Sequence, residues 1–305
     1  MKSLRYELAQ TSLILFTLAP MVFGQGSGMM GSGTLPSFIG YGGHELNQNL
    51  ILPQVAVGQH YTTSIVLLNV ANSQQMTWAT PQDLKTSGKM YFYKQDGSQL
   101  AVGVNGGTAS SEYAFSLAPS QTASFVLGSS GPDTSGWALI AVDDSPSTSG
   151  IGMMDGVQMS RGARIMATVF YAYKDGSQAR SRVGVIPSMY VMGLFKTSLM
   201  AVESGEDLYT GVAIVNTSAV TVNVLLRLKD VDGNVLATTP LSLAAGNQIA
   251  KFSSELFGNL LPSGTQGFME ISTNDDGVVA LGLLVSQEIM TSIPIMHYGQ
   301  ISMMR

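Results

Sequence analysis

The sequence predicts an all-β protein, built as two tandem antiparallel β-sandwiches behind an export signal. Three observations lead to this prediction: an apolar amino-terminal segment, alternating hydrophobic residues over most of the chain, and a set of motifs that occurs twice in the same order. The chain has 305 residues, enough for two domains of ordinary size. It has 34 glycines and no cysteine, so we expect a turn-rich fold that its hydrophobic cores hold together without disulfides.

Residues 1–24 are predicted to be a signal peptide. Lys2 and Arg5 give a positive start, and an apolar stretch runs from Leu13 to Phe23. That stretch is about half of the roughly 20 apolar residues that span a bilayer, so a cleaved signal is favoured over a membrane anchor. We therefore expect a secreted protein, extracellular or periplasmic, with no transmembrane segment in the mature chain. Residues 25–50 are rich in glycine, methionine and serine and are predicted to be a flexible lead-in.

Two parts of the chain match in the same order, at offsets of about 130 to 150 residues. The matching pairs are 60–69 with 208–216, 90–97 with 226–233, 115–120 with 241–246, and 135–144 with 266–276. Four matches in register are hard to obtain by chance, so we infer that one ancestral unit was duplicated. The first β-sandwich is expected over residues 51–190 and the second over residues 191–305.

Within each unit, apolar residues alternate with polar ones, as in a strand with one face on a core and one face in water. Val222, Val224, Leu226 and Leu228 are the clearest example. Glycine supplies the positive φ of a tight hairpin, so three Asp-Gly pairs predict turns. These turns separate predicted strands 90–94 from 99–102, 165–174 from 178–186, and 222–229 from 235–239. A single helical turn is expected at residues 253–258.

The second copy carries three further motifs: Asn-Thr-Ser at 216–218, L-x-D-x-D-G-x-V from 228 to 235, and L-x-L-x-x-G from 241 to 246. With these motifs the chain resembles the immunoglobulin-like and fibronectin-type-III-like tandem repeats of bacterial extracellular proteins. The resemblance covers the chain from residue 51 to its end and is better in the second copy. The resemblance implies a β-sandwich fold and an extracellular location. It implies no binding or catalytic site, because that broad class shares no functional residues. The first copy departs from it through insertions at 74–88 and 145–162, which are expected to be long loops.

Charge and motif content exclude several classes of function. With 15 Lys+Arg against 20 Asp+Glu, the net charge of −5 offers no basic surface for nucleic acid. Thiol chemistry is excluded because cysteine is absent, and the three histidines lack the spacing of metal ligands. A G-x-G-x-x-G pattern at 26–31 directly follows the signal peptide, whereas dinucleotide binding requires it between a strand and a helix.

Aromatic rings give the first set of candidate site residues, because flat rings stack on the faces of sugars. Tyr91 and Tyr93 share one face of a predicted strand, and Tyr171 and Tyr173 repeat that spacing. These four tyrosines are candidates for a carbohydrate-binding platform. The alternative is that they are buried or cover a neighbouring loop. Two other aromatic residues, Trp137 and Phe268, hold equivalent positions in the two copies and are expected to anchor the cores of their sandwiches.

Paired aspartates give the second set. Asp143-Asp144 and Asp275-Asp276 occupy matching turns, and a calcium ion would relieve the repulsion between adjacent carboxylates. The alternative is a solvated turn in which aspartate caps its own backbone. Calcium is the one cofactor that the sequence leaves open.

Together these observations predict an exported, non-enzymatic β-sandwich protein with an adhesive, scaffolding or ligand-binding role, with carbohydrate as one candidate ligand. Its expected partner is a cell-surface or extracellular polymer or protein, and not a nucleic acid. The alternative is a secreted hydrolase or lyase whose site is assembled from the loops of the first domain.

Overall fold

The computed structural model describes residues 49–71, 84–143, 165–176, 178–189, 196–258, 260, 263–286 and 289–297. All of them belong to one compact unit, Pro36–Arg305. The predicted signal peptide, the lead-in up to residue 48 and most of the two predicted long loops lie outside the described residues. Within the described residues the fold is all β, with antiparallel strand pairing and one five-residue helix, which confirms the predicted fold class.

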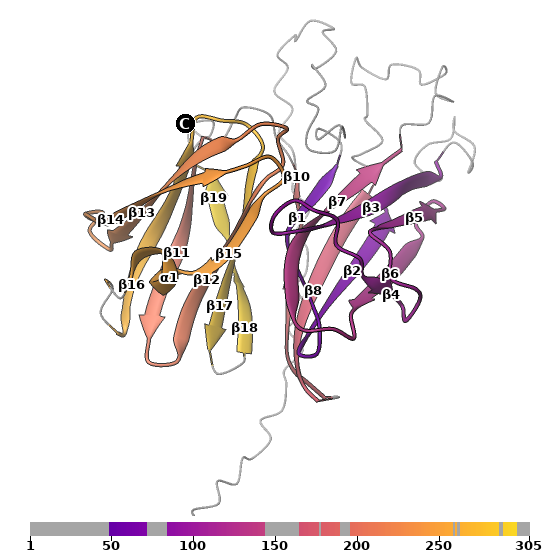
Figure 1. Ribbon diagram of the computed structural model, residues 1–305, viewed down its shortest axis with the longest axis horizontal. Helices are drawn as coiled ribbons and strands as arrows, with labels where there is room; N and C mark the ends of the chain where they lie inside the picture. Colours follow the sequence, from indigo (N-terminus) through magenta and orange to yellow (C-terminus); the bar gives the residue numbers. More distant parts are fainter. Residues whose placement is uncertain are drawn as a thin grey trace, which may run out of the picture. The chain divides into compact units, whose positions relative to one another are not determined.

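Strands β1 to β10 form two five-stranded sheets, in the orders β10-β1-β7-β3-β5 and β4-β6-β2-β8-β9 (Figure 1). Their bounds are β1 Leu50–Val57, β2 Tyr61–Asn69, β3 Thr86–Lys94, β4 Gly103–Val104, β5 Glu112–Leu117, β6 Thr122–Gly128, β7 Thr134–Val142, β8 Ile165–Asp175, β9 Gln178–Val185 and β10 Ser188–Met189. Apolar side chains from both sheets, such as Phe92 of β3 and Ile65 of β2, share one buried cluster. The two sheets are therefore the layers of a β-sandwich.

Strands β11 to β19 form a second sandwich. Their bounds are β11 Thr197–Gly205, β12 Leu208–Asn216, β13 Val222–Asp230, β14 Val235–Leu243, β15 Gln248–Phe252, β16 Thr265–Thr273, β17 Val278–Ser286, β18 Ile289–Ile293 and β19 Ile295–His297. One layer runs β14-β13-β16-β11-β19 and the other β15-β12-β17-β18. The layers are linked because β11 and β12 pair where their hairpin turns. Met269 of β16 and Ile214 of β12 lie in the core between them.

The two sandwiches have the same order of strand pairing. The layer β5-β3-β7-β1-β10 corresponds to β14-β13-β16-β11-β19, and β6-β2-β8-β9 corresponds to β15-β12-β17-β18. Only the two-residue strand β4 has no counterpart among the described residues. This agreement supports the duplication inferred from the sequence motifs.

A buried asparagine closes the same corner in both copies. The amide nitrogen of Asn69 donates to the carbonyl of Leu117 at 3.1 Å, and the amide nitrogen of Asn216 donates to that of Leu243 at 3.0 Å. Each asparagine oxygen also accepts the backbone N–H two residues later. Buried backbone groups require such partners, and a short amide side chain can supply them where the strand ends.

The predicted turns are confirmed. Gly97, Gly176 and Gly233 have φ values of 80°, 62° and 86° and lie just after β3, between β8 and β9, and between β13 and β14. The predicted helical turn is also present, as α1 Ser253–Phe257, in which the Glu255 carboxylate accepts the backbone N–H of Phe252 at 2.7 Å. In the part of the chain that the structure describes, no helix has the length and apolar character needed to cross a membrane.

Candidate functional site

The first sandwich packs the outer surface of one of its sheets against the second sandwich. We call this surface the aromatic face; its residues are Ile51, Tyr91, Tyr93, Trp137 and Leu139. It contacts Val215 and Val279 in the second sandwich, and these belong to a surface that we call the covered face, made up of Ala213, Val215, Val279, Leu281 and Leu283. The candidate site lies along this interface.

Trp137 is buried by the second sandwich and not by the core of its own. Its ring is 1% exposed and stacks on Tyr93, with the ring centroids 4.4 Å apart. Its counterpart Phe268 is 38% exposed. The expectation that both residues anchor sandwich cores is therefore wrong. Both point away from their cores, because inward positions on β7 and β16 are taken by neighbours such as Ala138 and Met269.

Hydrogen bonds fix the relative positions of the two sandwiches. The indole Nε1 of Trp137 donates to the carbonyl of Gly246 at 2.8 Å. The Gln248 side chain, 3% exposed, donates from Nε2 to the Pro53 carbonyl and to the Gln54 Oε1, both at 2.7 Å. These buried donors satisfy carbonyls that the interface removes from water.

A pocket of about 540 Å³ opens along the same interface. The first sandwich contributes strands β1, β2, β7 and β8 to its walls, and the second contributes β12, β15, β17, β18 and the helix α1. Aliphatic side chains such as Leu281 and Met290 form much of the lining, and they are accompanied by aromatic and charged groups. This size and this position between two domains are typical of a small-molecule site.

Aromatic rings line the pocket from both sandwiches. On the first sandwich, the lining residues Tyr61 and Tyr173 have ring centroids 5.5 Å apart. The imidazole of His60 stacks on Tyr173 from outside the lining, with the ring centroids 6.3 Å apart. On the second sandwich, Phe252 lines the pocket and contacts the ring of Tyr209 at 5.6 Å. Phe252 and Tyr209 are 39% and 44% exposed, so each has ring surface in contact with solvent.

Polar groups stand beside these rings. Asp133 accepts hydrogen bonds from the His60 backbone at 2.9 Å, and its carboxylate contacts His60 Nδ1 at 2.6 Å. Desolvation opposes ionisation of Asp133, but its hydrogen bonds with the backbone and ring of His60 outweigh that and lower the pKa of Asp133. Burial, together with the Asp133 charge, raises the pKa of Tyr61. Lys251 and Glu255 line the other side of the pocket, so it can offer both charged and neutral hydrogen-bonding groups.

The four predicted platform tyrosines do not share one exposed face. Tyr93 is 7% exposed and lies in the interface, and Tyr91 packs beside it, partly buried. Tyr171 is 2% exposed, and its hydroxyl donates to the Gln54 carbonyl at 2.6 Å. Tyr171 and Tyr173 do both line the pocket. The predicted binding role therefore stays a prediction, which the geometry restricts to the pocket and to Tyr173, the more exposed of the two.

The predicted calcium turns have protein partners in the second copy. The Asp275 carboxylate accepts the backbone N–H of Asn223 at 2.8 Å, and Asp276 forms an ion pair with Lys196 at 3.0 Å. In the first copy, the Asp143 N–H donates to a strand carbonyl, and Asp144 lies outside the described residues. Across the ranges that are described, acidic and histidine side chains form no group of three that could hold a metal ion. Calcium binding stays an untested prediction.

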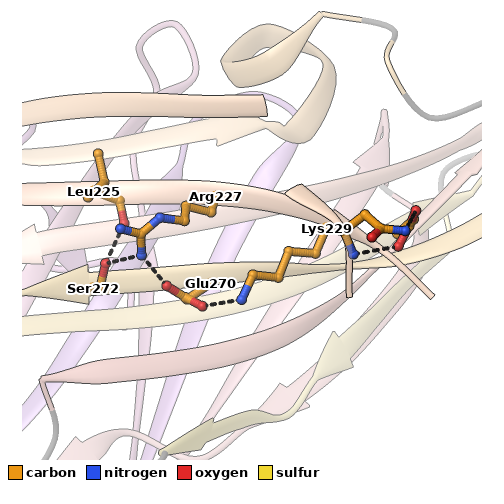
Figure 2. Close-up of polar contacts among 7 residues, drawn as sticks. Leu225, Arg227, Lys229, Glu270 and Ser272 are labelled. Atoms are coloured by element: carbon orange, nitrogen blue, oxygen red, sulfur yellow. Dashed lines mark hydrogen bonds and ion pairs between the residues drawn. The ribbon is translucent and has the colours of Figure 1, made fainter. Parts of the chain in front are cut away.

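Two polar contacts of the second sandwich could not be recognised in the sequence. Ser198 Oγ and His297 Nδ1 lie 2.8 Å apart on the paired strands β11 and β19, and neither residue lines the pocket. Figure 2 shows the other contact, in which Arg227 and Lys229 of β13 both pair with Glu270 of β16. The pairing register of β13 and β16 brings these charges together, and the sequence did not predict that register residue by residue. The alternation of charged and apolar residues along 226–229 did indicate that one face of this strand is charged.

The comparisons with known proteins add no family to these observations. No protein-family model, no curated protein and no solved structure matches this chain.

Proposed function

We propose that this chain is an exported, non-enzymatic binding protein that takes a carbohydrate of a cell-surface or extracellular polymer in the pocket between its two sandwiches. One observation carries the proposal: aromatic rings from both sandwiches line one pocket, where they stand beside charged side chains. Sugars present C–H faces that stack on rings and hydroxyls that bond to carboxylate, amide and ammonium groups. Tyr173 and Phe252 would stack on the ligand, while Lys251 and Glu255 would bind its hydroxyls.

Export and an immunoglobulin-like ancestry belong to the same proposal. Export is supported by the amino-terminal sequence, and the ancestry by the repeated turn motifs together with the sandwich fold. The mass of the mature protein, recovered from periplasm and from culture medium, tests export. A chain that begins at Gln25 supports it, and a chain that keeps residues 1–24 in the cytoplasm contradicts it.

Binding is tested on a glycan array of cell-surface and extracellular polysaccharide fragments, followed by calorimetry with the best ligand. Phe252→Ala and Tyr173→Ala are each expected to weaken binding by about two- to twelvefold, because a lost stacking contact is worth roughly 0.5–1.5 kcal/mol. The matched control is Phe268→Ala. Its ring is 38% exposed, close to the 39% of Phe252, but it lies outside the pocket.

Three results would overturn the proposal. The first is no binding to any glycan on the array, and the second is an equal loss of binding in Phe268→Ala. The third is catalytic turnover of a bound glycan that one point mutation abolishes, which would instead support the alternative of a secreted hydrolase or lyase. A hydrolase screen on the same fragments, run with the purified mature chain, provides that measurement.

A further inference from the structure

We propose that the first sandwich carries a docking surface for a different protein, one that presents an aromatic β-sheet face with an acidic residue at its edge. The surface is the outer side of β2, β6 and β8, and we call it the acceptor face. Its apolar residues are Val66, Leu68, Val126, Met166 and Phe170. It is separate from the pocket, since none of these five residues lines it.

The corresponding surface of the second sandwich shows what covers such a face. Leu68 pairs with Met166 on β2 and β8, just as Val215 pairs with Val279 on β12 and β17. Val215 and Val279 are 0% and 8% exposed, because the aromatic face of the first sandwich lies on them. Met166 is 56% exposed. The duplicated fold therefore presents the same surface twice, once covered and once open.

The open copy has kept an apolar residue at four of the five positions of the covered face. Val66 stands where the second sandwich has Ala213, and Phe170 stands where it has Leu283. At the fifth position Thr168 replaces Leu281. Val126 is 43% exposed and adjoins them on β6. Val66, Leu68 and Phe170 are half-buried and, with the exposed Val126 and Met166, make up the apolar part of this outer face. An apolar area on the outside of a sheet is where a partner protein can dock.

One substitution on the acceptor face indicates the charge of the partner. The guanidinium of Arg182 lies 4.2 Å from the ring centroid of Phe170, at the strand position that Met290 occupies in the second sandwich. An arginine stacked on a ring still has donors for a carboxylate. A partner with an acidic residue at the edge of its aromatic face would therefore fit this surface.

A second copy of this chain is a poor occupant. The only equivalent of the aromatic face that a copy could offer is the surface of the second sandwich that we call the charged face: Leu199, Arg227, Lys229, Phe268 and Glu270. In register, Arg227, Lys229 and Glu270 replace Tyr91, Tyr93 and Leu139. Covering this ion-pair cluster would remove its charges from water at a large desolvation cost. Since such a head-to-tail contact would also form open chains, the charged face protects the protein from polymerising.

The test supplies the missing aromatic face on the chain itself. A donor protein carries Arg227→Tyr, Lys229→Tyr, Phe268→Trp and Glu270→Leu, which copy the first sandwich, together with Met166→Asp to prevent self-association. The acceptor is the wild-type chain. Sedimentation velocity of the mixture is expected to show a one-to-one complex. Its affinity is expected to fall at least tenfold when the acceptor carries Met166→Asp, and to stay unchanged for the control Val231→Asp, whose side chain is 66% exposed in a distant turn.

The proposal is overturned if the folded donor stays monomeric beside the wild-type acceptor, or if it binds the Met166→Asp acceptor equally well. Circular dichroism and a cooperative unfolding transition establish that the donor is folded. If this donor does not fold, a donor that keeps Phe268 and carries Arg227→Tyr, Lys229→Tyr, Glu270→Leu and Met166→Asp, and so still lacks the ion-pair cluster, is mixed with the same acceptors, and the same outcomes apply. Self-association of the wild-type chain that Met166→Asp abolishes would also overturn it, because the occupant would then be a second copy.

Discussion

The aromatic face of the first sandwich and the charged face of the second lie on corresponding strands with the same register. The aromatic face is buried in an interface, whereas the charged face is in contact with solvent. Tyr93 and Trp137 pair across β3 and β7 in the first copy, and Lys229 and Phe268 pair across β13 and β16 in the second. The backbone is equivalent, so side-chain chemistry alone separates the two outcomes. Between two sandwiches with the same order of strand pairing, a few outward side chains therefore decide which sheet packs against the other sandwich.

The largest difference between the two faces is expected when the ring at the equivalent position of each face is removed. Trp137→Ala is expected to lower the free energy of unfolding by about 3–5 kcal/mol, because it empties a fully buried site and deletes the bond to Gly246. Phe268→Ala is expected to cost less than about 1 kcal/mol at its exposed position. Urea unfolding followed by circular dichroism measures both. Equal losses would mean that the two faces do not differ in burial.

A second experiment tests what the copies share. Asn69→Ala and Asn216→Ala are each expected to cost about 2–3 kcal/mol, because either change leaves buried carbonyls without a donor. Asn223→Ala, at an exposed strand position, serves as the control and is expected to change stability by less than about 0.5 kcal/mol. A large difference between Asn69→Ala and Asn216→Ala would show that the corner is not equivalent in the two sandwiches.

A third experiment compares Gln248, in the interface between the sandwiches, with its counterpart in the first sandwich. Gln248→Ala is expected to cost about 1–3 kcal/mol, since the Pro53 carbonyl and the Gln54 side chain lose their buried donor. The counterpart in the first sandwich is Thr122, which pairs with Leu68 as Gln248 pairs with Val215. Thr122 is exposed, so Thr122→Ala is expected to cost less than about 0.5 kcal/mol. Thermal unfolding of both variants at one pH measures the two losses of stability. Similar losses would contradict the expectation that Gln248 contributes more than Thr122.

The smallest expected effect concerns the charged face and depends on pH. Burial disfavours the ionised form of Glu270, but bonds to Lys229 and Arg227 outweigh burial and lower its pKa. The folded state therefore binds the proton more weakly than the unfolded state, so the stabilisation is complete above the unfolded pKa of about 4.3 and is lost as the pH falls through the folded pKa.

Glu270→Gln is accordingly expected to cost about 1 kcal/mol or less near pH 7, with the difference from wild type disappearing in strong acid. Urea unfolding at a series of pH values from 7 to 3 measures this difference. Glu112→Gln is the control, because Glu112 forms an exposed ion pair with Lys89 at 3.3 Å and is expected to show a smaller effect. A difference that grows towards low pH would contradict the assignment.

Much of the fold could be predicted because it depends on local patterns. Alternation identified the strands, and glycine at positive φ identified the hairpins at Gly176 and Gly233. The roles of Trp137 and Phe268 were predicted wrongly, because alternation shows that a strand has two faces but not what covers each of them. A signal was present, since residues 90–93 are apolar on both faces whereas 226–229 alternate with charges. A strand that is apolar on both sides indicates burial on both sides.

The class of fold and the positions of the turns could be predicted from the amino-acid sequence alone, because they follow from the periodicity and backbone preferences of neighbouring residues. Which outer faces meet, and where the pocket opens, can be seen only in the folded chain. The pocket joins Tyr61 and Tyr173 of one sandwich to Phe252 of the other through contacts between residues far apart in the chain. Such contacts depend on how two finished surfaces fit, and no short stretch of sequence records that fit.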